Sequence, residues 1–291
     1  MPVLHNALAV ANSKGGVGKT TLVAHVAGLA AHSGWRTLAV DLDPQGNLAR
    51  DLGYSPDSGR GLVAAALAGA VPEVIEGVRP GLDVVPGGPE TARLADQMLL
   101  DVVRTADASG LDRLGASLAP LAADYDLVVM DLPPGEAVIQ RAAMRCARFV
   151  VIPTTGDAAA NDGLGGVFGR YMAERAANPE LEVLGVAVTF VGAGASAMLR
   201  AIRQELAEML EGSVTVFEPP VRLAKRAAMD CRAKGLLAHE YEAAKAQAPP
   251  WYAGARGESY AHNASGLADD YQQLVGRILA SFSERVALAY R

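Results

Sequence analysis

The sequence is poor in cysteine and in aromatic residues, and it has no excess of positive charge. Of its 291 residues only two are cysteines, 5% are aromatic, and the formal net charge is −6. Cys146 and Cys231 lie far apart and outside any metal-binding spacing, so a cysteine-based metal motif is excluded. We expect both to be small core residues of a protein in a reducing compartment.

Long uncharged apolar runs are absent as well. None reaches the roughly 18 residues that a membrane-spanning helix requires, and the N-terminus leads directly into a short apolar run instead of a signal peptide. We therefore expect a cytoplasmic protein with no membrane partner. The net negative charge argues against a surface coated with positive charge, but it says nothing about local basic patches.

Apolar runs alternate with helical patterns along the chain, and most of them are continuous, as in strands buried on both faces. This alternation predicts an α/β fold, a doubly wound and mainly parallel sheet with helices on both faces. We expect one domain over residues 1–291, with a C-terminal helical extension from about residue 235. The runs that we interpret as strands are Ala7–Ala11, Thr37–Leu42, Leu82–Pro86, Leu127–Asp131, Phe149–Pro153, Val183–Phe190 and Val214–Phe217.

A glycine-rich stretch links the first predicted strand to a helical pattern that continues to about His32. It reads Ser13-Lys14-Gly15-Gly16-Val17-Gly18-Lys19-Thr20-Thr21. Glycines let backbone N–H groups approach one concave site, and the following helix N-terminus favours phosphate oxygens. Lys19 is expected to reach the β- and γ-phosphates, and the Thr20 hydroxyl to ligate Mg²⁺. The residues predicted to bind nucleotide here are Lys14, Gly15, Gly16, Val17, Gly18, Lys19, Thr20 and Thr21.

Carboxylates follow two other predicted strands. Asp41 and Asp43 end the second strand in the segment D-L-D-P-Q-G-N, and Asp131 ends the fourth, just before L-P-P-G. Ligands of parallel sheets bind at the carboxyl ends of the strands, where these side chains would meet the glycine-rich loop. Such carboxylates suit the positioning of a metal ion and of an attacking water. Asp131 is expected to hold Mg²⁺.

The glycine-rich stretch departs from the standard pattern G-x-x-x-x-G-K-[ST], because Ser13 stands where the first glycine would be. With Lys14 it reads K-G-G-x-G-K-T, which resembles the deviant phosphate loop of the ParA/MinD ATPases. The resemblance implies ATP and ADP as ligands, Mg²⁺ as cofactor, and a homodimer in which Lys14 reaches the phosphate of the other subunit. It also implies a catalytic set of Lys14, Lys19 and Asp43, and a magnesium side formed by Thr20, Asp41 and Asp131.

The segment after the last predicted strand is basic. V-R-L at residues 221–223 resembles the ParA pattern, whose E-A-P is replaced here by Lys225-Arg226-Ala227. The resemblance implies that Pro219 or Pro220 lies against the adenine. It also implies an arginine patch that binds DNA without reading its sequence, through phosphate neutralisation. The residues predicted for this patch are Arg200, Arg203, Arg222, Lys225 and Arg226. A solvated surface run is the alternative on composition alone.

Three further segments have predicted roles in packing. Glu90–Arg104 reads as an amphipathic helix on the sheet. A helix over Asp157–Ala176 contains four glycines, which indicates either close packing or local irregularity. The last helix, Ser265–Tyr290, has one apolar face and few flanking lysines, so docking on the sheet is favoured over a membrane anchor. Residues 246–266 read as a loop or extended arm.

The leading hypothesis is a partition ATPase that dimerises with ATP, binds double-stranded DNA non-specifically, and hydrolyses ATP slowly until a ParB-like or other adaptor stimulates it. Such a protein would be cytoplasmic and associated with the nucleoid. The alternative is a membrane-surface positioning ATPase like MinD. Nitrogenase-reductase and iron–sulfur-carrier activities lack their cysteines here, and no room precedes residue 7 for a sequence-specific helix-turn-helix.

Overall fold

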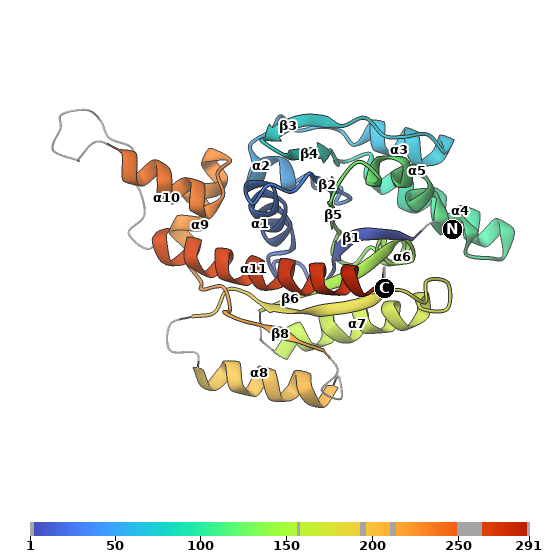
Figure 1. The fold of residues 1–291 in the computed structure, drawn as a ribbon. Helices are drawn as coiled ribbons and strands as arrows, with labels where there is room; N and C mark the ends of the chain where they lie inside the picture. The colour runs from blue at the N-terminus through green and yellow to red at the C-terminus, as the bar shows by residue number, and fades with distance from the viewer. Residues whose placement is uncertain (1–2, 156–157, 193–195, 210–213, 249–263, 290–291) are drawn as a thin grey trace.

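The computed structural model describes residues 3–155, 158–192, 196–209, 214–248 and 264–289. Its centre is an eight-stranded sheet in the order β3-β4-β2-β5-β1-β6-β7-β8, parallel except for the β3–β4 pair (Figure 1). The predicted α/β fold is therefore confirmed. The strands are β1 (Leu4–Val10), β2 (Thr37–Asp41), β3 (Ile75–Arg79), β4 (Leu82–Val85), β5 (Leu127–Asp131), β6 (Ala147–Thr154), β7 (Glu182–Val188) and β8 (Val216–Phe217).

All seven predicted strands are present, β5 with the predicted ends and the others with shifted ends, and β3 is the one that sequence patterns missed. It reads I-E-G-V-R, pairs antiparallel with β4, and forms the edge of the sheet. An edge strand is partly exposed, so it lacks the continuous apolar run that marks the inner strands. Pro80 and Gly81 join β3 to β4, and Gly81 takes a φ of +77° that suits such a tight connection.

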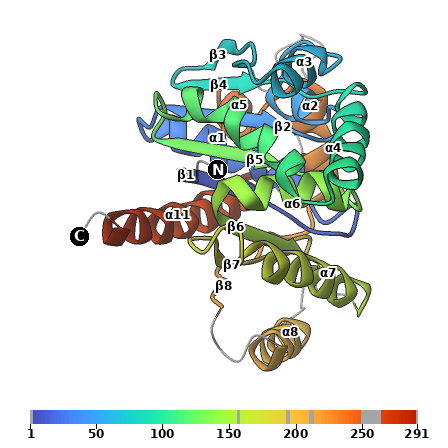
Figure 2. The same cartoon turned by 90° about the vertical axis from the view of Figure 1, so that its right-hand side faces the viewer.

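Helices cover both faces of the sheet (Figures 1 and 2). Alternate strand side chains point to opposite faces: Ala7 and Ala9 pack with α3 to α8, whereas Leu8 and Val10 pack with α1, α2 and α9 to α11. The first group is α3 (Arg60–Ala68), α4 (Thr91–Thr105), α5 (Arg113–Ala122), α6 (Ala137–Cys146), α7 (Ala158–Glu174) and α8 (Ser196–Met209). The second is α1 (Lys19–His32), α2 (Leu48–Leu52), α9 (Lys225–Lys234), α10 (Ala238–Gln247) and α11 (Ala264–Ala289). A short 3₁₀ turn, Ser109–Asp112, precedes α5.

The long helix α11 lies across one face of the sheet, as its apolar stripe predicts (Figure 1). Its large apolar side chains from Leu267 to Phe282 are buried, and the Phe282 ring meets Phe149 of β6 edge-on at 5.2 Å between centroids. The apolar stripe of α11 is thus buried in the core and does not face outward. Among the described residues, no helix has the length and apolarity needed to cross a bilayer.

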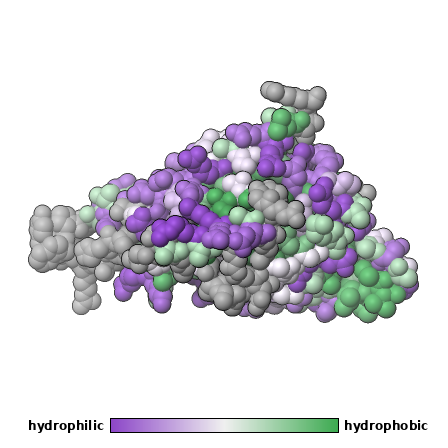
Figure 3. Space-filling view, turned by 90° about the horizontal axis from the view of Figure 1, so that it is seen from below, coloured by the Kyte–Doolittle hydropathy of each residue, from purple (hydrophilic) through white to green (hydrophobic). Residues whose placement is uncertain are grey.

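Seen from the α8 side, the surface is mainly hydrophilic, and its most compact hydrophobic patch lies at the right-hand end (Figure 3). Both cysteines are buried and unlinked, as predicted. The predicted arm at 246–266 lies mostly outside the described residues, as does Asp157, the expected cap of α7.

Candidate nucleotide site

The glycine-rich stretch forms the loop between β1 and α1. Gly16 and Gly18 take φ values of +77° and +80°, a left-handed conformation that side chains with a Cβ rarely adopt. Gly18 is also the N-cap residue of α1, and no side chain caps this helix. The first N–H groups of α1 therefore receive no capping side chain from Gly18 and, with the helix dipole, favour an anion at this end.

Asn12, the residue directly before the glycine-rich loop, links the loop to the end of β6. The Asn12 amide donates to the Pro153 carbonyl at 2.7 Å, and its oxygen accepts the Lys14 N–H at 2.8 Å. The glycines of α7 allow this helix to approach: a Cβ on Gly163 would lie 2.5 Å from the Asn12 oxygen, and one on Gly166 would lie 2.6 Å from the Ser13 hydroxyl. Two of the four glycines are thus explained by close packing on the loop.

Arg170 of α7 joins the loop to the segment after β5. Its guanidinium donates to the Ser13 hydroxyl and, at 3.0 Å, to the Gln140 side-chain oxygen. The Gln140 amide in turn donates to the Pro133 carbonyl at 2.7 Å. The start of the glycine-rich loop and the L-P-P-G segment therefore share one hydrogen-bonded support.

Lys19 is buried at the start of α1, and its ammonium donates to the Lys14 carbonyl at 2.9 Å. Burial lowers the pKa of Lys19, while the negative charges of Asp131 and Asp43 act in the opposite direction. Lys19 thus lies between the loop backbone and two of the three predicted carboxylates.

Asp41 and Asp131 are paired in register at the ends of the neighbouring strands β2 and β5, and both are fully buried. Asp41 accepts the N–H groups of Asp43 at 3.0 Å and Leu48 at 3.3 Å. Burial raises the pKa of Asp41 to about 7. Burial and the Asp41 charge raise the pKa of Asp131 well above its ordinary range, although the nearby Thr20 side chain opposes this shift.

By hydrogen-bond geometry neither oxygen of the buried Asp131 carboxylate has a partner among the described residues, although the Thr20 hydroxyl lies close enough to lower its pKa and the Lys19 charge acts in the same direction. An unpartnered buried carboxylate is costly, which points to a missing positively charged ligand. Together with the Thr20 hydroxyl it offers the oxygen donors that Mg²⁺ prefers. No group of three or more His, Cys, Asp or Glu side chains in the described ranges could hold a metal alone. A Mg²⁺ ion here would complete its shell with water and phosphate oxygens, and would neutralise phosphate charge.

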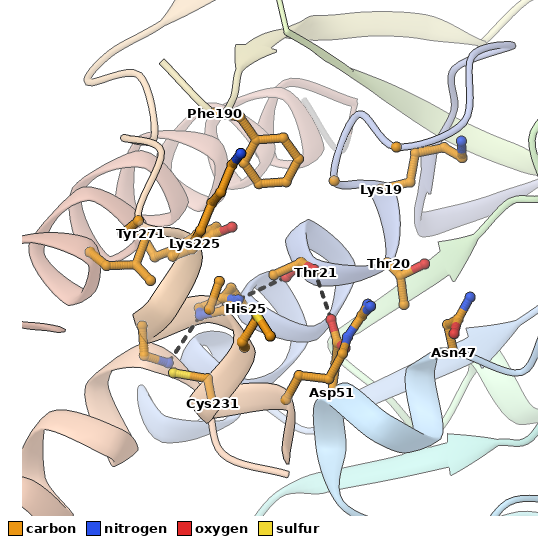
Figure 4. Close-up of a pocket in the computed structure, with 18 of the residues that line it drawn as sticks. Lys19, Thr20, Thr21, His25, Asn47, Asp51, Phe190, Lys225, Cys231 and Tyr271 are labelled. Atoms are coloured by element: carbon orange, nitrogen blue, oxygen red, sulfur yellow. Dashed lines mark hydrogen bonds and ion pairs between the residues drawn. The ribbon is translucent and has the colours of Figure 1, made fainter. Parts of the chain in front are cut away.

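A cavity of about 530 Å³ opens from the glycine-rich loop towards α9 and α11 (Figure 4). Lys19 and Thr20 lie on one side of it, and Phe190, Lys225 and Tyr271 lie on the other. Phe190 has a φ of +58°, and its ring packs against Gly18. Pro219 and Pro220 are not among the residues that line this cavity, so their predicted adenine contact stays a prediction.

A family model described as an AAA domain matches residues 5–183. The chromosome-partitioning ATPase Soj of Thermus thermophilus is 34% identical over 224 residues, which cover 75% of this chain and 83% of that protein. The chain belongs to the ParA/MinD family of P-loop ATPases.

Solved structures of similar fold agree with this placement. McdA of Cyanothece, in its apo form, has a TM-score of 0.71 at 17% identity, covering 94% of this chain and 99% of that one. Cobyrinic acid a,c-diamide synthase of Mycobacterium smegmatis with bound ADP and magnesium has a TM-score of 0.64 at 25% identity, covering 88% and 98%. The pNOB8 ParA bound to nonspecific DNA has a TM-score of 0.57 at 20% identity, covering 99% of each chain.

The predicted DNA-binding residues of this family member are mostly engaged in ion pairs. Arg222 holds Asp270 of α11 through two hydrogen bonds of 2.6 and 2.8 Å. Arg226 pairs with Asp230 at 3.0 Å, one turn along α9. Arg203 of α8 pairs with Glu218, and Arg200 lies exposed on the same helix. Lys225 and Arg222 both line the cavity.

The cavity residues that the sequence patterns did not single out include His25, Asp51 and Tyr271. Burial lowers the pKa of His25 to about 4. Its ring stacks on Tyr271 with 3.6 Å between centroids. Its Nδ1 donates to the Thr21 carbonyl at 2.8 Å, while Nε2 accepts the Ala238 N–H at 3.1 Å. Thr21 lies on the same helix as His25, but Tyr271 and Ala238 lie on α11 and α10, so no local pattern could have predicted those contacts. Asn12, in contrast, was recognisable as a polar residue between a buried strand and the loop.

Proposed function

We propose that this chain is a Mg²⁺-dependent ATPase that dimerises with ATP, binds duplex DNA without reading its sequence, and thereby segregates or positions cargo. Hydrolysis is slow until a ParB-like or other adaptor protein stimulates it. The γ-phosphate favours the dimer through contacts that ADP does not make, so hydrolysis releases both DNA and monomers. The protein works in the cytoplasm, in association with the nucleoid.

The observation that carries this proposal is the unpartnered Asp131 carboxylate beside the uncapped start of α1. Asp131 and Thr20 supply oxygen donors for Mg²⁺, while Lys19 and the loop N–H groups face phosphate. Asp43 is held by a hydrogen bond from its own N–H to Asp41 and accepts the Gln45 N–H at 2.9 Å. We assign the attacking water to Asp43 and the contact across the dimer interface to Lys14.

Support for the DNA partner comes from the relative that was solved on nonspecific DNA and from the basic start of α9. Arg222 is a poor residue for testing this role, because its loss would leave Asp270 with an exposed fraction of only 6% and no cation. Lys225 and Arg226 are better choices, since neither supports a carboxylate on another element of the described structure.

The test is binding to random-sequence duplex DNA with ATP, with ADP and without nucleotide, across a salt series. We expect binding only with ATP, and an affinity that falls steeply with salt because counterions are released. The variant Asp43→Ala should keep ATP binding, dimerisation and DNA binding while hydrolysis falls by a factor on the order of 10²–10⁴. Loss of ATP binding in that variant would contradict the water-positioning role.

An ATP-dependent dimer that binds no DNA at any salt concentration would overturn the DNA partner. Sedimentation with liposomes would then test the MinD-like alternative. The burial of the α11 apolar side chains predicts that the protein stays in the supernatant.

A further inference from the structure

The short helix α2 lies between the predicted metal site and α9. It begins at Leu48, directly after the D-L-D-P-Q-G-N segment, and the Leu48 N–H donates to Asp41 at 3.3 Å. The beginning of α2 is therefore tied to the carboxylate that the family resemblance places on the magnesium side. A rearrangement at Asp41 would act on α2 first.

Asp51 of α2 joins three separate elements. This carboxylate has an exposed fraction of 6%. One oxygen accepts the Thr21 hydroxyl at 2.8 Å, and the other accepts the Arg232 Nε–H at 2.6 Å. Thr21 lies in the first turn of α1, directly after the glycine-rich loop, and Arg232 lies in α9, so one side chain connects both to α2 (Figure 4 shows the Thr21–Asp51 bond).

The far end of α2 is fastened to α9 a second time. Gly53 and Gly235 follow the two helices, both with positive φ, and a Cβ on Gly53 would lie 2.9 Å from the Gly235 carbonyl oxygen. Arg79 of β3 donates to the Leu52 carbonyl at 2.9 Å and to the Gly235 carbonyl at 3.0 Å. It also pairs with Glu240 of α10. These contacts hold the C-terminal ends of α2 and α9 close together, whereas the Asp51–Arg232 pair joins the two helices within their lengths.

We propose that Asp51 is a positioning residue that couples nucleotide binding at the phosphate loop to the placement of α9. This inference rests on the proposed function, because α9 carries Lys225 and Arg226, the residues assigned to DNA. Without the Asp51–Arg232 pair, α9 would lose its charged contact with the loop while the phosphate site stays intact. DNA would then bind with an affinity that depends less on nucleotide.

The test compares the DNA dissociation constant without nucleotide with that in a non-hydrolysable ATP analogue and Mg²⁺. Allosteric coupling of this kind is typically about 5–150-fold. In Arg232→Gln we expect the ratio of the two DNA dissociation constants to fall from its wild-type value towards about 1, while the affinity of the protein for the ATP analogue changes less than about twofold. Arg285→Gln is the matched control: it removes another half-exposed arginine, paired with Glu182 on β7, and should keep the ratio.

A second variant, Asp51→Asn, tests the same ion pair in case Arg232→Gln does not fold. The amide oxygen can still accept the Thr21 hydroxyl, but it no longer offers a charge to Arg232, so the ratio should fall here as well. An unchanged ratio in both variants would overturn the coupling role of Asp51.

Hydrogen exchange of residues 225–234 separates this inference from the DNA assignment. In the wild type, the analogue with Mg²⁺ should alter protection of α9, and in Arg232→Gln it should not. If that difference in protection appears but the protein does not bind DNA in the binding assay, the DNA assignment fails and the coupling stands. An equal response in both proteins, or no response in the wild type, overturns the coupling whatever the DNA result.

Discussion

Two clusters of buried carboxylates in this molecule differ in what surrounds them. Glu174, at the end of α7, has an exposed fraction of 1% and is held by Arg141 and Arg145 of α6. Asp131 is buried at least as deeply, yet no described residue donates a hydrogen bond to its carboxylate. Burial alone therefore does not distinguish a structural acid from a functional one, whereas the absence of a partner does.

The difference has an energetic meaning. A buried carboxylate with arginine partners is needed by the fold, because removing it strands the guanidinium charges. A buried carboxylate without partners costs stability until a cation arrives, which is the usual state of a site kept for binding. The same chemical change, carboxylate to amide, should therefore have opposite effects in the two clusters.

Glu174→Gln should give the largest loss of stability. Arg145, whose side-chain exposed fraction is only 12%, would keep Asp112 at 2.7 Å but lose its second carboxylate. Breaking a buried ion pair of this kind typically costs about 3–5 kcal/mol. Urea denaturation measures the change, with the exposed Glu208→Gln as the matched control. A cost equal to that of the control would remove the distinction between the two clusters.

Asp131→Asn should act in the other direction in nucleotide-free protein. A carboxyl pKa raised by folding contributes stability that is fully present below the ordinary value of 3.8 and is lost as the pH rises through the folded value. For Asp131 this loss therefore begins above pH 3.8 and continues as the pH rises towards its elevated folded value.

At pH 8 the Asp131→Asn variant should thus be more stable than the wild type, because the amide does not have to be ionised inside the fold. The excess should shrink at pH 4, and stabilisation by Mg²⁺ with nucleotide should be lost. Urea denaturation at both pH values measures this, with exposed Asp124→Asn as control. A variant less stable than the wild type at pH 8 would place Asp131 with the structural acids.

The sequence predicted the unpartnered cluster better than the paired one. Asp41 and Asp131 are the last residues of their strands and Asp43 follows one, and strand ends of a parallel sheet converge, so local patterns sufficed to bring them together. Glu174 contacts Arg145 only through the packing of α6 on α7, and no spacing in the sequence predicts this ion pair.

The same reason explains why the sequence predicted the glycine-rich loop but not the contacts on the α9 side of the cavity. Asp51 and Arg232 are 181 residues apart, and Arg222 and Asp270 are 48 apart. The long-range pair with Asp270 shows that Arg222, which was predicted for the DNA-binding patch, supports α11. The edge strand β3 was missed for a related reason, since half-exposed residues carry no continuous apolar signal.

Arg226→Gln should have the smallest effect on stability. It compares the two buried carboxylate clusters with an ion pair on the protein surface. Its pair with Asp230 spans one exposed turn of α9, and Asp230 would keep the Tyr241 hydroxyl at 2.9 Å. Such pairs contribute about 0.3–0.5 kcal/mol. If Arg226 contacts a DNA phosphate, the slope of log affinity against log salt should nevertheless fall by about 1. Arg175→Gln, just after α7 on the opposite face of the sheet, is the control that should leave the slope unchanged. Equal slopes for Arg226→Gln and the wild type would move the DNA contact away from the start of α9, because a charge that neutralises no phosphate releases no counterion.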